Sequence, residues 1–288
     1  MLAVTDAAEV PERGELIAEG RTAHVYTSGL DRVVKIFRPG FPDALGEEEA
    51  AAARVADQAG IGAPRFFGVA RVDGRIALIY ERRDGASMME HLHANPWRAG
   101  GLAGTLGSLH AGMHDSSAES LPRVRDAVIA AIRGAKAIAG AAAHDAALTR
   151  AQALPDGTAL CHGDFHPGNV LLGSAGPSII DWLTAGAGPP AADVARTLLL
   201  LRDGALPDEM PMSQRLRIGL LRRWFVRAYL GGYRRIRRLE MDEVAAWRLP
   251  LLVARMDEGI EAERAHLLRR IADEMRRSAG EQAHRFEE

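Results

Sequence analysis

A ten-residue segment of this sequence, CHGDFHPGNV at 161–170, combines side chains that could do chemistry with residues that bend the backbone. Its glycines and proline interrupt any helix or strand, so we expect a structured loop. Asp164 and Asn169 lie five positions apart on it and can point into one cleft. If the apolar stretches 170–172 and 178–180 pair as strands, they bring Asp181 beside Asn169. Converging carboxylate and amide oxygens would make a site suited to Mg²⁺, and Asp164 would be free to accept a proton from a hydroxyl.

The pattern His-x-Asp-x-x-x-x-Asn, followed by an aspartate after a strand, resembles the catalytic loop of kinase-like phosphotransferases. The fuller form, His-Gly-Asp-x-His-x-Gly-Asn with Ile-Asp-Trp, resembles the aminoglycoside phosphotransferase family. The resemblance implies that Asp164 orients the acceptor hydroxyl and takes its proton, while Asn169 and Asp181 hold Mg²⁺. It also implies that His162 supports the loop and that Asp193 is the buried aspartate that braces it.

The same resemblance assigns a nucleotide-binding lysine to the first 85 residues. Lys35 lies where the family places this lysine, on the third expected strand, and only one other lysine accompanies the arginines of the chain. Glu49, on the helix that follows, is the expected partner of Lys35. Glu47 and Glu48 remain rivals, because only one of three consecutive helical residues can face Lys35 squarely.

Two further nucleotide contacts follow from the resemblance. Gly20 lies in the expected phosphate-covering loop, although Thr22 and Val25 stand where the usual glycine pattern has further glycines. The adenine is expected against the backbone of the segment from Glu81 to Arg83, which links the two halves of the chain.

The elements that must position these residues divide the chain into two parts. The first is rich in strands, and its last two strands are joined by Asp73-Gly74, a strong hairpin signal. The second is mostly helical. Pattern and resemblance together predict an α+β, protein-kinase-like two-lobe fold. We expect a nucleotide-binding N-lobe at 1–84, a small antiparallel sheet with one helix, and a larger, mostly helical catalytic and acceptor-binding C-lobe at 85–288. The main strands are expected at 15–18, 24–27, 32–37, 66–72 and 75–80, and the main helices at 45–59, 102–113, 126–147, 191–201, 213–238 and 242–277.

Bulk composition excludes several classes of protein. The 288 residues carry a net charge of −2 and a pI near 6.6, which do not favour nucleic acid or anionic lipid as partner. The single cysteine argues against a disulfide framework and fits a reducing compartment. The sequence has neither an 18-residue apolar stretch nor a signal-peptide pattern. We therefore expect a cytoplasmic monomer or homodimer that binds a small-molecule hydroxyl acceptor, without nucleic acid or membrane as partner.

The segment 215–238 holds nine arginines and no acid. A patch for nucleic acid or membrane is one interpretation. The favoured interpretation is a solvated helix face, with Leu216, Leu220, Leu221, Trp224, Tyr229 and Leu230 toward the core.

These observations predict an ATP- or GTP-dependent, Mg²⁺-dependent O-phosphotransferase that acts on an aminoglycoside, another antibiotic, an amino sugar or an amino alcohol. Two alternatives stay open: a kinase-like nucleotide-binding module without turnover, and a metal-dependent hydrolase that uses His162, Asp164 and His166. A protein kinase is disfavoured, because the twelve-residue step from Asp181 to Asp193 is too short for a peptide-holding activation segment. A polycationic acceptor would need a carboxylate cluster; the candidates are Asp257, Glu258, Glu261 and Glu263, diluted by neighbouring arginines.

Overall fold

The structure is a computed structural model that describes residues 12–203 and 211–285. Its contacts divide the chain into two units. The sheet unit comprises the described residues up to Pro96 together with Pro167–Ala185, and the helical unit comprises Trp97–His166 with the described residues from Gly186 onward. Each is described by itself.

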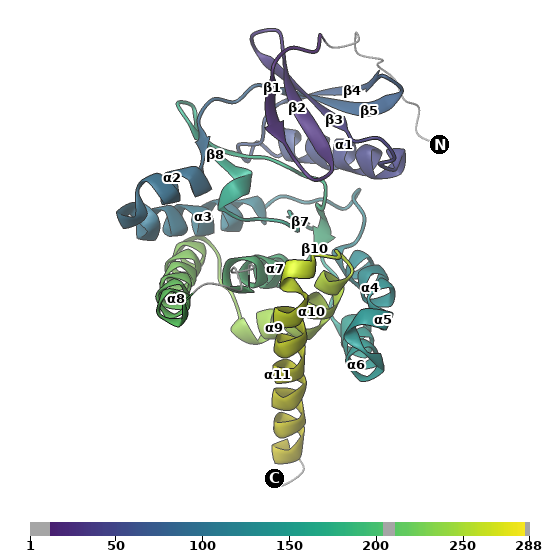
Figure 1. Ribbon diagram of the computed structural model, residues 1–288, viewed down its shortest axis with the longest axis vertical. Coiled ribbons are helices and arrows are strands. Elements are labelled where there is room, and N and C mark those ends of the chain that lie inside the picture. The colour runs from purple at the N-terminus through teal and green to yellow at the C-terminus, as the bar shows by residue number, and fades with distance from the viewer. Residues whose placement is uncertain (1–11, 204–210, 286–288) are drawn as a thin grey trace. The chain divides into compact units, whose positions relative to one another are not determined.

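Five antiparallel strands form the main sheet of the sheet unit, in the order β1-β2-β3-β5-β4. The strands are β1 (Leu16–Glu19), β2 (Ala23–Ser28), β3 (Arg32–Phe37), β4 (Phe66–Val72) and β5 (Arg75–Glu81). One helix, α1 (Asp43–Gln58), lies along the sheet (Figure 1). Alanines of α1 pack with Phe37, Ile76 and Leu78. A Cβ at Gly46 would come within 2.8 Å of Ile76, so glycine permits this close approach.

The predicted hairpin between β4 and β5 is present. Asp73 and Gly74 both have positive φ, 52° and 74°, the conformation that a two-residue hairpin turn matching the strand twist requires. The register continues from this turn, with Val72 opposite Arg75. Short local signals therefore fix the pairing of the two strands.

A second, three-stranded sheet in the sheet unit carries part of the catalytic-loop motif. It consists of β6 (Ala86–Ser87), β8 (Val170–Gly173) and β9 (Gly176–Ile179). The 3-10 turn η2 (Pro167–Asn169) precedes β8. Helix α2 (Met88–Ala94), which the sequence reading did not predict, begins at a capping box in which Ser87 and Glu90 bond reciprocally.

The helical unit is built around α3 and α8. A Cβ at Gly107 would collide with the carbonyl of Tyr229, and a Cβ at Gly232 with the backbone of Gly104, so glycines on both helices permit the approach. The α-helices of this unit are α3 (Ala99–Met113), α4 (Val124–Gly134), α5 (Lys136–Ala139), α6 (Ala141–Ala153), α7 (Pro190–Asp203), α8 (Met212–Ile236), α9 (Met241–Ala246), α10 (Arg248–Met256) and α11 (Glu261–Arg285). Two short strands, β7 (Ala159–Cys161) and β10 (Gly186–Gly188), pair with each other, and the 3-10 turn η1 (Pro96–Arg98) precedes α3. No helix among the described segments is both long and apolar enough to cross a membrane.

Two expected long helices are broken in the structure. The stretch 126–147 is interrupted at Gly140, whose φ is 84°. In the stretch 242–277, helix α10 ends before Gly259, whose φ is 65°. Positive φ is accessible to glycine without steric cost and commonly terminates helices. Helical composition predicted the elements correctly but not these breaks.

The favoured interpretation of the arginine-rich helix α8 is partly wrong. Tyr229 is fully buried, but the apolar side chains of its first half are exposed: Leu216 63%, Leu220 65%, Leu221 62% and Trp224 47%. The close packing of α8 on α3 involves residues from Trp224 onward, where the glycines are. Hydrophobic periodicity gives the apolar side of a helix, but not which turns of it have a partner.

Candidate active site

Lys35 and Glu49 form a buried ion pair in the sheet unit. The Lys35 Nζ donates to both Glu49 carboxylate oxygens at 2.8 Å, from β3 to α1. The two side chains are 12% and 1% exposed. Glu47 and Glu48 are exposed, so Glu49 is the partner of Lys35. The buried Tyr80 hydroxyl also donates to Glu49 Oε1, at 3.1 Å, a contact that the sequence did not signal.

Asp181 joins the same ammonium group. The Lys35 Nζ donates to Asp181 Oδ1 at 2.7 Å. Pairing of β8 with β9 sets Val170 opposite Ile179, and the Ile180 N–H donates to the Asn169 carbonyl at 3.0 Å. This ladder brings Asn169 and Asp181 to one end of the small sheet, as the sequence predicted. Asp181 has φ +67°, a left-handed conformation that aspartate tolerates and that is enriched at functional sites.

The charges of this group are unbalanced. All three N–H donors of Lys35 bond carboxylate oxygens, so one cation faces two anions. Burial raises the pKa of Glu49 and Asp181 raises it further, while Lys35 opposes both. Burial would lower the pKa of Lys35, but Glu49 and Asp181 raise it. The Asp181 side chain is 45% exposed. An accessible carboxylate in an anionic site, near an asparagine, fits a hard divalent cation such as Mg²⁺.

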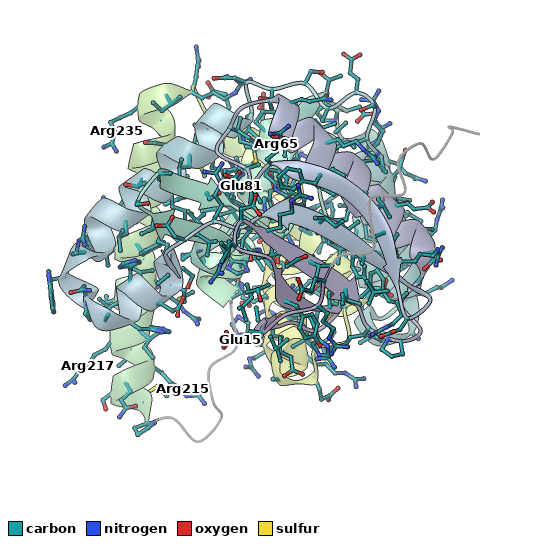
Figure 2. The ribbon with its side chains drawn as sticks, turned by 90° about the horizontal axis from the view of Figure 1, so that it is seen from above. Glu15, Arg65, Glu81, Arg215, Arg217 and Arg235 are labelled. Carbon is teal, nitrogen blue, oxygen red and sulfur yellow. The ribbon has the colours of Figure 1, made fainter. Side chains whose placement is uncertain are left out.

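The expected phosphate loop and base-binding segment lie elsewhere in the sheet unit. Gly20 lies in the turn between β1 and β2, where its N–H donates to the Ala23 carbonyl and its own carbonyl accepts from Arg38 Nε. The Glu81 N–H donates to the Arg65 carbonyl, so these two residues are neighbours (Figure 2). The Arg83 guanidinium pairs with Glu81 at 3.0 Å.

Among the described residues, Lys35 bonds Glu49 and Asp181 and does not bond Gly20, Glu81 or Arg83. The Arg82 N–H is also used, by the Asp31 carbonyl. In the segment 81–83 this leaves the backbone N–H of Arg83 as the donor with no partner among the described residues.

Asp164 and His166 form an ion pair in the helical unit. His166 Nε2 lies 3.5 Å from Asp164 Oδ2, and both side chains are about one-third exposed. Burial would raise the pKa of Asp164, but the hydrogen bond and charge of His166, helped by Arg196 and His162, lower it to about 2. Asp164 is therefore a carboxylate at neutral pH. The sequence left the role of His166 open; its contact is with Asp164.

Asp193, at the start of α7, braces the loop that carries Asp164. Its carboxylate accepts the backbone N–H groups of His162 at 2.6 Å and Gly163 at 2.9 Å. His162 is fully buried, and its Nδ1 accepts the Asp164 N–H at 3.3 Å. This arrangement orients the peptide groups directly before Asp164.

His110, in the last turn of α3, and His114, at the C-cap of this helix, complete the surroundings of Asp193. His110 Nε2 and His114 Nε2 lie 3.0 and 3.2 Å from Asp193 Oδ2. Their other ring nitrogens meet the hydroxyls of Tyr229 and Tyr233 on α8, at 2.6 and 2.7 Å. Burial and the charge of His114 lower the pKa of His110 to about 4. Sequence reasoning missed these four residues, although each pair is spaced i, i+4 on an otherwise apolar helix face.

The hydrolase alternative gains no support from this geometry. Among the described residues, the one cluster whose ligand atoms lie close enough together for a metal ion is His110, His114 and Asp193. It does not contain the predicted set of His162, Asp164 and His166.

Arginines pair with several of the acids expected to meet a cationic acceptor. Arg196 Nε donates to the Gly163 carbonyl at 3.1 Å, and its guanidinium pairs with Glu258. Arg255 pairs with both Glu258 and Glu263. The negative charge at the junction of α10 and α11 is therefore largely neutralised.

Comparison with known proteins decides the family. The model of the phosphotransferase enzyme family matches residues 14–239, more than half of the chain. The chain belongs to the phosphotransferase enzyme family. This membership confirms the predicted enzyme class, a small-molecule phosphotransferase. No curated protein matches the sequence.

Solved structures confirm the kinase-like fold of this phosphotransferase. An amicoumacin kinase in complex with AMP-PNP, Ca²⁺ and its antibiotic has a TM-score of 0.56 at 17% identity, covering 92% of this chain and 88% of that one. An aminoglycoside-3'-phosphotransferase of type VIII has a TM-score of 0.56 at 20% sequence identity, and the match covers 84% of this chain and 93% of that one. The ADP-bound aminoglycoside phosphotransferase APH(2'')-Ib has a TM-score of 0.53 at 14% sequence identity, and the match covers 92% of each chain.

Proposed function

We propose that this phosphotransferase transfers the γ-phosphate of ATP or GTP to a hydroxyl group of a small molecule in the cytoplasm. The observation that carries the proposal is the three-way contact of Lys35 with Glu49 and Asp181. Phosphoryl transfer needs a fixed cation for the phosphates and a carboxylate for the metal at the same point. Nucleotide complexes of the amicoumacin kinase and of APH(2'')-Ib support the choice of donor.

Each residue of the sheet unit has a distinct part in this proposal. Lys35 binds α- and β-phosphate oxygens, and Glu49 with Tyr80 keeps its ammonium positioned. Asn169 and Asp181 would hold Mg²⁺, which would supply neutralisation of the charge on the phosphates. Asp181 bonds Lys35 in this structure, so it would have to give up that contact to act as a metal ligand.

Asp164 orients the acceptor hydroxyl and accepts its proton. A carboxylate with a pKa of about 2 is a weak base. A weak base is sufficient, because the transition state of phosphoryl transfer is loose and little proton transfer is needed before the new bond forms. Positioning is then its main contribution. The backbone bonds from His162 and Gly163 to Asp193 fix that position.

The base of the nucleotide is bound by the backbone N–H of Arg83. The N–H groups of Glu81 and Arg82 already bond carbonyls of the fold. One donor just beyond the end of β5 can pair with an acceptor on either purine, so adenine and guanine remain candidates. The Gly20 turn covers the phosphates, and Arg38 holds its shape through the Gly20 carbonyl.

The acceptor carries at most one positive charge. A polycationic aminoglycoside is recognised by unpaired carboxylates, whereas Glu258 and Glu263 already pair with Arg196 and Arg255. An amino alcohol, an amino sugar or a neutral hydroxylated antibiotic fits this charge distribution better.

A turnover assay tests the proposal. Purified protein is incubated with Mg²⁺, ATP or GTP, and a panel of neutral, monocationic and polycationic alcohols, and nucleoside diphosphate release is measured. Turnover with at least one uncharged or monocationic alcohol, abolished by Asp164→Asn, supports the proposal. Nucleotide binding without turnover on any alcohol would support the binding-module alternative, and a preference for polycations would refute the acceptor assignment.

A further inference from the structure

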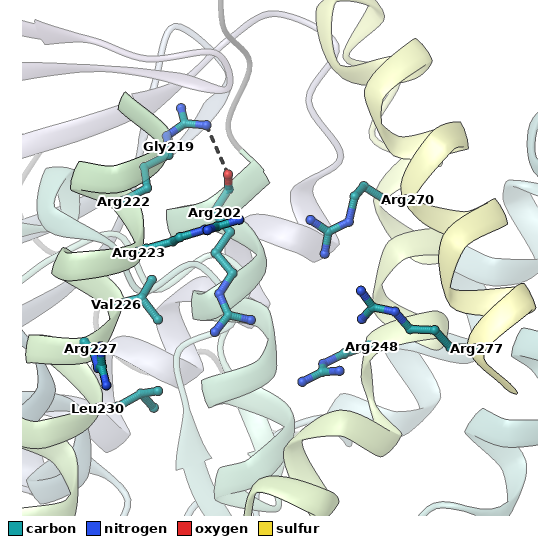
Figure 3. Close-up of a pocket in the computed structure, with 10 residues that line it drawn as sticks. All are labelled: Arg202, Gly219, Arg222, Arg223, Val226, Arg227, Leu230, Arg248, Arg270 and Arg277. Atoms are coloured by element: carbon teal, nitrogen blue, oxygen red, sulfur yellow. Dashed lines mark hydrogen bonds between the residues drawn. The ribbon is translucent and has the colours of Figure 1, made fainter. Parts of the chain in front are cut away.

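The helical unit contains a cavity lined mainly by arginine. Its volume is about 470 Å³, and seven of its ten lining residues are arginines from α7, α8, α10 and α11. Figure 3 shows the guanidinium groups of Arg202, Arg248, Arg270 and Arg277 directed toward one central space. A cavity of this size falls in the range that accommodates small ligands.

Nearby carboxylates offset little of this positive charge. Asp203 pairs with Arg270 at 2.8 Å and is shared with His266. Glu274 lies 3.9 Å from Arg277. Within the part of the chain that the structure describes, no carboxylate pairs with the other five lining arginines: Arg202, Arg222, Arg223, Arg227 and Arg248.

Like charges crowd one another in this cavity. Burial lowers the pKa of Arg202, and repulsion from Arg248 and Arg270 lowers it further, against the attraction of Asp203. Arginine nevertheless keeps its proton in proteins. A bound anion would relieve this repulsion, and the chain as a whole, with a net charge of −2, has concentrated cations here.

The arginine cavity is separate from the Asp164 loop of the helical unit. Asp193 lies in the first turn of α7 and braces that loop, whereas Arg202 lies nine residues further along the same helix. At 1.5 Å per residue, the two positions are about 13 Å apart along the helix axis. Neither Asp164, His166 nor Asp193 lines the cavity.

We propose that this cavity binds a small polyanion with two or more phosphoryl groups. A guanidinium group can form two parallel hydrogen bonds to the oxygens of one phosphoryl group. The cluster of arginines can therefore surround several linked phosphoryl groups, whereas a single phosphoryl group would leave most of the arginines without an anionic partner. An extended nucleic acid would instead need a surface track, and the outward arginines of α8 such as Arg215, Arg217 and Arg235 (Figure 2) do not line the cavity.

Calorimetric titration of the full chain with inorganic tripolyphosphate, in EDTA, tests the proposal. Removing two guanidiniums with Arg202→Gln/Arg248→Gln should weaken binding about a hundredfold, since each charge-assisted bond contributes at least about tenfold. The matched control Arg238→Gln/Arg276→Gln removes two charges that pair with Glu240 and Asp273 outside the cavity, and should change affinity less than about twofold. Binding to Lys35→Met should equal that of the wild type.

Melting temperatures separate loss of binding from loss of folding. Because repulsion is relieved, Arg202→Gln/Arg248→Gln should melt no lower than the wild type without ligand, while the tripolyphosphate-induced rise disappears. The proposal is overturned if tripolyphosphate does not bind, or if both double variants bind alike, or if Lys35→Met alone abolishes binding. Equal affinity for orthophosphate would refute the requirement for linked phosphoryl groups, and tighter binding of a single-stranded oligonucleotide would indicate a macromolecular ligand instead.

Discussion

Replacement of Lys35 by methionine separates the structural part of the Lys35 cluster from its functional part. The substitution leaves Glu49 as a buried carboxylate, 1% exposed, with Tyr80 as its remaining donor. Breaking a buried ion pair from one side costs about 3–5 kcal/mol. For 288 residues, an unfolding entropy of about 0.6 kcal/mol/K converts this loss into a melting temperature lower by about 5–8 °C.

The other carboxylate of the cluster should behave differently. Asp181 is 45% exposed, so its charge stays hydrated when a partner is removed. Asp181→Asn should therefore change the free energy of unfolding by less than about 1 kcal/mol, while activity is lost because a proposed metal ligand is removed. The two substitutions should therefore differ in their effect on stability, with a large loss for Lys35→Met and a small change for Asp181→Asn.

The stability deficit of Lys35→Met should depend on pH. Burial raises the pKa of Glu49, and without Lys35 the pKa rises further. A group whose pKa is higher in the folded than in the unfolded state contributes its stability below the unfolded value, about 4.3, and that contribution is lost as pH rises through the folded value. The deficit should be larger at pH 8 than at pH 5.

Urea denaturation of Lys35→Met, Glu49→Gln and the double variant at both pH values provides the measurement. The neutral amide removes the buried charge, so the double variant should be more stable than Lys35→Met alone. A Lys35→Met protein within 1 kcal/mol of the wild type, or a double variant whose loss equals the sum of the single losses, would refute the buried-pair reasoning.

Three further predictions concern the helical unit. Asp164→Asn should lower kcat by about 10²-fold or more while the nucleotide-induced rise in melting temperature persists; unchanged kcat would remove Asp164 from the mechanism. The Asp164 pKa of about 2 lies below the ordinary value of 3.8, so its contribution to stability is present above the ordinary value and lost as pH falls toward 2. His166→Gln should raise the pKa of Asp164 and move the acid limb of the kcat/KM profile to higher pH. If His166 contributes only packing, the acid limb should not move. Asp193→Asn should cost at least about 3 kcal/mol in chemical denaturation, because several hydrogen bonds to a buried charge are weakened together.

Local signals carried most of what the sequence predicted. The hairpin needed only Asp73-Gly74, whereas Lys35 was assigned by the resemblance to aminoglycoside phosphotransferases, supported by the scarcity of lysine in the chain. The pairing of β8 with β9 followed from two apolar runs of matching length. The sequence favoured Glu49 as the partner of Lys35 but left Glu47 and Glu48 as rivals, since the rotation of α1 on the sheet is a tertiary property.

The features that the sequence did not predict depend on which faces of the helices and strands pack against one another. Tyr80 lies on a strand buried along nearly its whole length, where no alternation marks one side chain as different. The bonds from Tyr229 to His110 and from Tyr233 to His114 each join residues 119 positions apart. The strand β10 is Gly-Ala-Gly, with no strand propensity of its own, and exists because β7 offers it a partner.

Two aspartates of the chain illustrate how environment assigns different parts to one residue type. Asp193 is buried, and its oxygens accept from two backbone N–H groups and meet two histidines, so binding a ligand there would first require breaking those bonds. Asp181 is half exposed, strained at φ +67° and held by one shared ammonium. Under the proposed function, Asp181 would give up that contact to hold a metal ion, and Lys35 would keep its bonds to Glu49. Asp181, the carboxylate with fewer internal bonds, is suited to binding a ligand, and Asp193, the carboxylate with more, is suited to positioning the loop before Asp164.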